Sequence, residues 1–112
     1  MSENIYNYKI VTNGDMASTI TSPAVDLSKT DGYSVYAKWT GAAAAGSINL
    51  EVSLNDINFV PMFSSATSVA GPGDALWEIT TAFYDKIRVV FTPTGGSVGV
   101  LNVQINGKGD RI

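Results

Sequence analysis

Carboxylates are the only common acid–base side chains in this sequence, because it contains no His and no Cys. The absence of His and Cys excludes Ser-His-Asp and Cys-His catalysis and removes the usual zinc ligands. A carboxylate pair can hydrolyse a glycosidic bond when the two acids flank a sugar ring. Most acidic residues lie instead in turn-like segments, where Asp hydrogen-bonds its own backbone. These turn residues are Asp15, Asp26, Asp31, Asp56, Asp74 and Asp85. The sequence therefore predicts a protein that is not an enzyme and has no catalytic residues.

Metal and phosphate sites lack their usual motifs in the sequence. No Asp-x-Asp-x-Asp run indicates a calcium loop, although an isolated metal contact at Asp56 or Asp74 is an alternative that stays open. The Gly71-Pro72-Gly73 segment is not followed by the Lys and Ser or Thr of a phosphate-binding loop. We therefore expect no cofactor and no resident metal.

The aromatic side chains suggest a second kind of chemistry, because exposed rings can stack on sugars or anchor a protein interface. Trp39 has the same alternation as Val35, so it is predicted to face the core. Trp77 shares a face with Ile79 and is predicted to be buried as well. Tyr36 points to the opposite face and is predicted to be an exposed interface anchor.

The elements that position these side chains follow from alternation of apolar and polar residues, the dominant pattern in the chain. Strong strands are predicted at 33–39, 48–54, 87–91 and 101–105, and weaker ones at 6–11, 18–21, 59–63 and 75–80. No segment is suited to the crossover helices of a parallel sheet. The pattern predicts an all-β fold of about eight strands, an antiparallel β-sandwich of the jelly-roll type.

Two segments leave alternatives open. Gly41 and Gly46 bracket an alanine run at 42–45 that is too short for a stable helix, so a flexible loop is predicted there. The segment 74–87 fits strand, bend and strand, but Leu76 and Ile79 also have helical spacing with the residues that follow them.

Length and composition indicate one small domain that packs against something else. The 112 residues form a single domain at 1–112, with short terminal arms at 1–4 and 108–112. Only 15% of the residues are charged, against about 25% in ordinary globular proteins. A surface so poor in charge favours burial against a partner, and exposed sheet edges suggest self-association as a dimer.

Charge and hydropathy exclude several partners and one route of export. The net charge is −3 and the cationic residues are scattered, so we expect neither nucleic acid nor a membrane surface as a partner. The N-terminus has no basic and apolar signal-peptide pattern. Synthesis in a host cytoplasm is therefore expected, with release by lysis or within a larger assembly.

Several short motifs occur in an order that resembles a known group of proteins. They are Ser-Pro-Ala-Val-Asp-Leu at 22–27, Trp-Thr-Gly at 39–41, Val-Ser-Leu-Asn at 52–55, and Arg-Val-Val-Phe-Thr at 88–92 before Gly95-Gly96. This order resembles small β-sandwich (jelly-roll-like) structural proteins of tailed bacteriophages, in particular capsid decoration or stapling proteins of the epsilon-fifteen-like type. The likeness extends over residues 18–107, and Ile57 departs from it because Gly is usual in that turn.

The resemblance implies a virion structural protein that binds the outer surface of the capsid shell and stabilises subunit contacts. Its partner would be the major capsid protein of the same virion, and its location the capsid exterior. The alternative is a carbohydrate-binding or tail and fibre accessory module, motivated by Trp77 and the exposed tyrosines.

Three segments are predicted to make the contacts, namely 3–8, 41–46 and 68–74. Gly and Ala in the last two would allow the backbones of two proteins to approach closely. The candidate interface residues are Glu3, Tyr6, Tyr8, Tyr36, Gly41, Ala43, Gly46, Val69, Gly71, Pro72 and Gly73.

Overall fold

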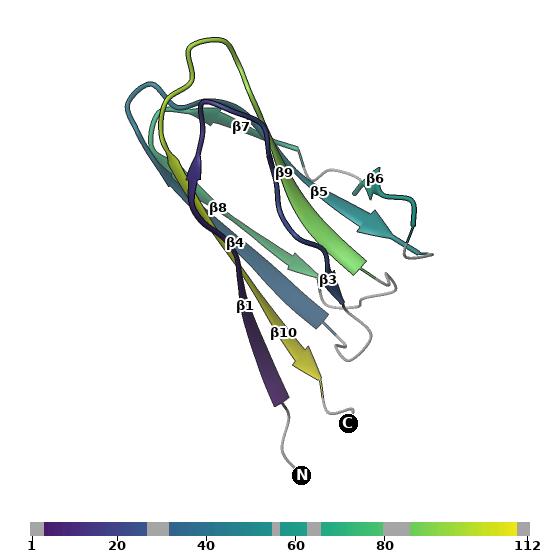
Figure 1. Ribbon diagram of the computed structural model, residues 1–112. Coiled ribbons are helices and arrows are strands. Elements are labelled where there is room, and N and C mark those ends of the chain that lie inside the picture. Colours follow the sequence, from purple (N-terminus) through teal and green to yellow (C-terminus); the bar gives the residue numbers. More distant parts are fainter. Residues whose placement is uncertain (1–3, 27–31, 55–56, 63–65, 80–85, 110–112) are drawn as a thin grey trace.

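The alternating segments form strands that each turn one apolar face inward (Figure 1). The computed structural model describes residues 4–26, 32–54, 57–62, 66–79 and 86–109. Within these ranges there are ten strands. They are β1 (Asn4–Asp15), β2 (Ile20–Thr21), β3 (Val25–Asp26), β4 (Gly32–Thr40), β5 (Ala45–Ser53), β6 (Val60–Pro61), β7 (Thr67–Ala70), β8 (Gly73–Ile79), β9 (Lys86–Pro93) and β10 (Val100–Gly109).

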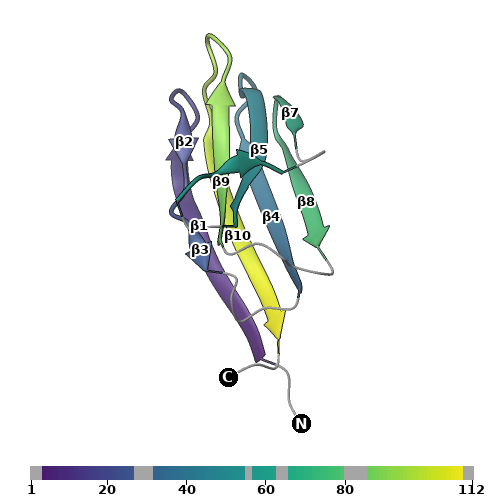
Figure 2. The same cartoon turned by 90° about the vertical axis from the view of Figure 1, so that its right-hand side faces the viewer.

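The strands form two antiparallel sheets that lie face to face (Figures 1 and 2). Sheet A has the order β1-β10-β4-β8. Sheet B has the order β2-β9-β5-β6, with β3 also on β9 and β7 also on β5. The predicted all-β sandwich is therefore confirmed. Each of the eight predicted strands corresponds to an observed one, while β3 and β7 were not predicted.

The pairing is nested from the ends of the chain inward. The first strand pairs with the last, β2 and β3 pair with β9, β4 pairs with β8, and β5 pairs with β6 and β7. A long hairpin rolled up in this way is a jelly roll, and the nested strand pairs alternate between sheet A and sheet B. Splitting two of its strands into β2 and β3 and into β6 and β7 explains why ten strands occupy eight places.

The inward faces of the two sheets make one core. Its fully buried side chains include Val35 in β4, Leu50 in β5, Phe91 in β9 and Ile105 in β10. Burying one such side chain contributes about 1.5–3 kcal/mol, so the alternation that defines the strands also drives the sheets together. Trp39 is 5% exposed, which confirms its predicted place in the core.

The predicted terminal arms and the predicted bend differ in part from the structure. Asn4 begins β1 and pairs with Gly109, and Lys108 pairs with Ile5, so Asn4 and residues 108–109 belong to sheet A and not to free arms. On either side of the predicted bend, β8 extends to Ile79 and β9 starts at Lys86. The helical alternative is therefore wrong for residues 74–79 and 86–87, and residues 80–85 lie outside the described part.

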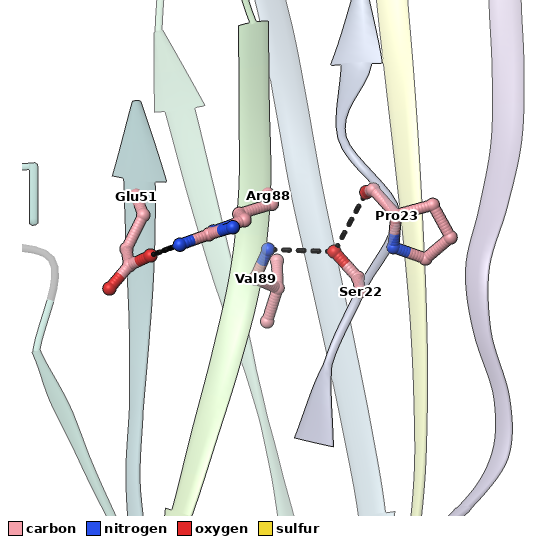
Figure 3. Close-up of polar contacts among 5 residues, drawn as sticks. All are labelled: Ser22, Pro23, Glu51, Arg88 and Val89. Atoms are coloured by element: carbon pink, nitrogen blue, oxygen red, sulfur yellow. Dashed lines mark hydrogen bonds and ion pairs between the residues drawn. The ribbon is translucent and has the colours of Figure 1, made fainter. Parts of the chain in front are cut away.

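The junction of β2 and β3 depends on one buried hydroxyl (Figure 3). From Thr21 to Val25 the chain advances four residues while its partner β9 advances three, from Val90 to Ile87, so one residue is extra. Ser22 lies at this bulge and is 5% exposed. A bulge locally breaks the backbone ladder, which leaves a donor on β9 to be satisfied.

The Ser22 side chain satisfies that donor (Figure 3). Its backbone N–H donates to the Val89 carbonyl at 2.9 Å. In return the Val89 N–H donates to the Ser22 hydroxyl oxygen at 2.8 Å, and the hydroxyl donates to the Pro23 carbonyl at 3.0 Å. Ser22 and Pro23 of the sequence motif thus connect β2 and β3 to β9 at the bulge in sheet B.

Replacing Ser22 with Ala should destabilise the protein by about 1–3 kcal/mol, because the buried Val89 N–H would lose its acceptor. Urea unfolding measures the change in the free energy of unfolding. Ser18→Ala is the matched control, since Ser18 is exposed and removing its hydroxyl group should hardly change the free energy of unfolding. Equal losses in the two variants would contradict the assigned role of the hydroxyl.

Candidate functional site

One end of the sandwich gathers four connections between strands. They join β1 to β2 (16–19), β4 to β5 (41–44), β7 to β8 (71–72) and β9 to β10 (94–99). We call these four segments the loop end. They lie at the upper end in Figure 1, opposite the two chain termini. Two of the three predicted contact segments, 41–46 and 68–74, therefore meet here, and the N-terminal segment 3–8 does not.

Hydrogen bonds connect the β4–β5 turn at residues 41–44, which we call the alanine turn, to the tip of the β9–β10 hairpin. The Val98 N–H donates to the Ala43 carbonyl at 3.3 Å, and the Thr94 N–H donates to the Ala45 carbonyl at 3.0 Å. The Ala45 N–H donates to the Ser97 hydroxyl at 3.1 Å. These bonds hold 41–44 as a turn in the place of the predicted loop, and Ala45 begins β5.

Three further hydrogen bonds connect the segments of the loop end to one another and to the core. The Gly71 N–H donates to the Ala44 carbonyl at 2.8 Å, and Ala44 itself is 2% exposed. The indole Nε1–H of Trp39 donates to the Gly71 carbonyl at 2.8 Å. On the other side, the Met16 N–H donates to the Gly99 carbonyl at 3.0 Å. The loop end is therefore continuous with the core.

Two glycines of the predicted interface serve contacts within this chain. Gly41 has a φ of 125°, and a Cβ there would lie 2.6 Å from the Val98 carbonyl oxygen. Gly46 has a φ of 148°, and a Cβ there would meet the Thr92 carbonyl oxygen. The close backbone approach that the sequence suggested between two proteins occurs inside one molecule, because the turn packs on the β9–β10 hairpin.

The segment 68–74 is also more ordered than a loop. Thr67–Ala70 is strand β7 and β8 starts at Gly73, which leaves a turn at 71–72. Val69 is 4% exposed and belongs to the core, so its predicted role as a contact residue is wrong. Its alternation with the exposed Ser68 and Ala70 was the available signal.

The exposed surface of the loop end consists of small, uncharged side chains. None of its four segments contains a charged residue. Val98 is 61% exposed and is its largest exposed apolar side chain. The other exposed residues include Ala42, Ala43, Pro72, Gly95 and Gly96, with Gly73 beside them. Depletion of charge is typical of the centre of protein interfaces.

Sequence reasoning missed two members of this surface, the segments 16–19 and 94–99. The second carried a signal in Gly99, where a Cβ would meet the Thr40 carbonyl oxygen and lie 3.2 Å from the Met16 sulfur. Glycine at such a packed position indicates close approach of backbones. Sequence spacing does not show which backbone approaches.

The predicted tyrosines lie away from the loop end. Tyr36 is 40% exposed on the outer face of sheet A, as predicted. Tyr8 is 42% exposed on β1, beside a shallow groove that β1 forms with residues 23–26. Tyr6 pairs with Gly107 through its backbone, and Glu3 lies outside the described residues. The candidate residues therefore do not form one continuous surface.

Two of the remaining chemical candidates, Asp74 and Trp77, lie within the described ranges. Asp74 accepts a hydrogen bond from the Tyr36 hydroxyl at 3.1 Å. Partial desolvation raises the pKa of Tyr36, and the hydrogen bond and negative charge of Asp74 raise it further. Trp77 is partly buried and packs against the core, which agrees in part with its predicted burial and leaves little of its ring open for sugar stacking.

Metal ligands and membrane spans can be judged over the described ranges only. Within them, His, Cys, Asp and Glu form no group of three or more that could hold a metal ion. The same residues include no helix that is long and apolar enough to cross a bilayer. Asp56, one of the two isolated metal contacts left open, falls outside them.

Comparison with solved structures shows chains of the same fold. The SPBc2 prophage-derived protein YomS has a TM-score of 0.69 and 10% sequence identity, over 96% of both chains. A chain from the disulfide-linked pili of Bacillus endospore appendages has a TM-score of 0.55 and 12% identity, over 98% of this chain and 93% of that one. The coat protein of Tobacco streak virus has a TM-score of 0.50 and 10% identity, over 98% and 89%. At these identities the likeness shows the fold alone.

Sequence comparison adds no relative to these structural neighbours. No protein-family model matches the chain, and no curated protein matches it.

Replacing Gly41 with Ala should destabilise the protein by about 2 kcal/mol or more, because the left-handed backbone is strained and the Cβ clashes with Val98. Thermal or urea unfolding measures the loss. Gly95→Ala is the matched control in the same loop end, since a Cβ at Gly95 has no atom within 4 Å, and it should change stability by less than about 0.5 kcal/mol. Similar behaviour of the two variants would show that the turn is not fastened as described.

Proposed function

We propose that this chain is a non-catalytic structural protein of a tailed-bacteriophage virion, and that it decorates the outer surface of the capsid shell. In this proposal the loop end binds the major capsid protein. The observation that carries it is the loop end itself, a fastened surface with no charged residue and with Val98 exposed at 61%. A decoration protein acts by contact alone. A neutral surface whose segments are already hydrogen-bonded to one another before binding suits that task.

The rigidity of the loop end supports a contact role through its effect on binding entropy. Ordering a mobile loop on binding costs about 0.5–1.5 kcal/mol for each immobilised side chain. Here the hydrogen bonds from Trp39, Gly71 and Val98 order the segments before any partner arrives. A capsid lattice repeats each contact many times, so weak individual contacts are enough for stable attachment.

The fold neighbours support the same class of protein. YomS is described as prophage-derived, and the Tobacco streak virus chain is a coat protein. The elongated shape, with extents of 48 × 28 × 20 Å, separates the loop end from the chain termini, which lie at the other end (Figure 1). One end can therefore face a shell while the other points away from it.

Self-association through a sheet edge remains a prediction. Strand β8 lies at one edge of sheet A and β1 lies at the other. An edge strand offers backbone donors and acceptors to a second copy. A lattice-bound decoration protein does not require such a dimer, so the two proposals are independent.

Cryo-electron microscopy of particles produced with this protein present would test the main proposal. We expect density of jelly-roll shape on the outside of the shell, with the loop end against the capsid subunits. Mass spectrometry of the same purified particles should detect the chain. Absence from the particle, or a position only in the tail, would overturn the decoration role.

Replacing Val98 with Asp should weaken particle binding more than tenfold. Burying an unpaired carboxylate in a neutral interface should reduce the binding free energy by about 2 kcal/mol or more. Co-sedimentation of the purified protein with undecorated particles measures the affinity. Val60→Asp is the matched control, since Val60 is 57% exposed and lies in β6 on sheet B. Unchanged melting temperatures would confirm that both variants fold, and equal binding by both would place the contact elsewhere.

A further inference from the structure

The outer face of sheet A is hollowed where β1 departs from regular pairing. The register between β1 and β10 shifts between Lys9 and Val11 and again between Val11 and Gly14. Asn13 between them has a φ of 52°, the left-handed conformation. Such bulges re-aim side chains and are over-represented next to binding sites. They open a groove of about 280 Å³ that spans β1, β10 and β4.

Two cross-strand rows of side chains line this groove. In the first row Lys9 lies opposite Gln104, which lies opposite Tyr36. In the second row Asn102 lies opposite Lys38. The two lysines thus occupy opposite corners of the groove, on strands β1 and β4. With strands about 4.8 Å apart, these corners are separated by about 10 Å across the sheet.

The charge of the groove is unbalanced. Neither Lys9 nor Lys38 forms an ion pair with any described residue, and no acidic side chain lines the groove. Asp74 lies opposite Lys38 on the β8 side but accepts a hydrogen bond from the Tyr36 hydroxyl instead. That bond holds the exposed Tyr36 side chain at the border of the groove. Two lysines that form no ion pair among the described residues, beside an aromatic side chain whose hydroxyl engages the neighbouring Asp74 carboxylate, are the features of a site for an anionic ligand.

Amide and hydroxyl groups complete the lining. The Asn102 side-chain oxygen accepts the Asn13 N–H at 2.9 Å, and its amide nitrogen has no partner among the described residues. Gln104 and Thr12 add an amide and a hydroxyl. These groups bond sugar hydroxyls, and an aromatic ring packs on the apolar face of a sugar.

We propose that this groove binds a carboxylate-bearing saccharide, with its acid groups at Lys9 and Lys38 and a sugar ring against Tyr36. The inference goes beyond attachment to a shell and does not depend on it. Because the groove and the loop end lie on different parts of the molecule, a shell-bound copy could still present the groove.

The sheet geometry favours a saccharide over a peptide. The groove spans β1, β10 and β4, and the last two strands are already paired on both sides within sheet A. An extended peptide binds a sheet by adding to a free edge, and the free edge here is the side of β1 that faces away from β10 and Lys38. Recognition must therefore come from side chains. The separation of the two lysines suits the carboxylate groups that repeat along an acidic saccharide chain.

Oligogalacturonate is the probe that tests this inference, with neutral dextran and poly-L-glutamate as comparisons. Titration calorimetry at low salt should detect binding to oligogalacturonate, weakening as salt screens the lysines. Dextran should bind much more weakly because it carries no charge. Absence of binding to oligogalacturonate, or equal binding to poly-L-glutamate, would overturn the saccharide assignment.

Substitutions then locate the site. Lys9→Gln and Lys38→Gln should each weaken binding about threefold to fivefold, and the double variant about tenfold or more. Tyr36→Ala should weaken it about tenfold through lost ring packing. Lys86→Gln on sheet B, which changes the net charge equally, and Tyr8→Ala, which removes a similarly exposed ring, should leave the affinity unchanged.

The same variants separate this inference from the proposed virion role. Lys9→Gln with Lys38→Gln should leave particle binding intact, and Val98→Asp should leave saccharide binding intact. If the double lysine variant retains full affinity for oligogalacturonate, or if the two controls lose affinity as strongly, the groove is not the site. Either result would leave the shell-binding test unaffected.

Discussion

Burial of the inner faces of two sheets is the constraint on which the rest of this structure depends. Phe91, Leu50 and Val35 meet between the sheets, and Trp39 closes the core near the loop end. Because the indole of Trp39 also donates to the Gly71 carbonyl at 2.8 Å, core packing and loop geometry form one unit. The connections at that end are held by hydrogen bonds that continue from the core.

The molecule separates two kinds of surface. The loop end is neutral and built from small residues, with backbone hydrogen bonds between its segments. The outer face of sheet A carries polar and charged side chains, among them Lys9, Lys38 and Gln104. A neutral rigid surface suits extended contact with another protein, whereas a charged groove suits a specific ligand. The nested pairing of the jelly roll supports both, since it leaves one face of each sheet free.

Much of the fold could be predicted because alternation reports directly on burial. The inward Trp39 and the outward Tyr36 follow from their positions in one strand, since side chains change face at every residue. Short or irregular elements were harder to predict. Strand β3 has two residues and depends on the Ser22 bulge, and the alanine turn is ordered by bonds to a hairpin about fifty residues away, as the Ala45–Ser97 separation of 52 shows.

By itself the sequence determined the strand class, the face of each long strand, and the lack of His and Cys chemistry. Only the tertiary structure decided which strands are neighbours. Because β10 lies between β1 and β4, Lys9, Gln104 and Lys38 come together from distant parts of the chain. Local periodicity has no information on that order, which is set by how the whole chain rolls up to bury its apolar faces. The candidate surfaces of this domain therefore arise from the pairing of strands that are distant in the sequence.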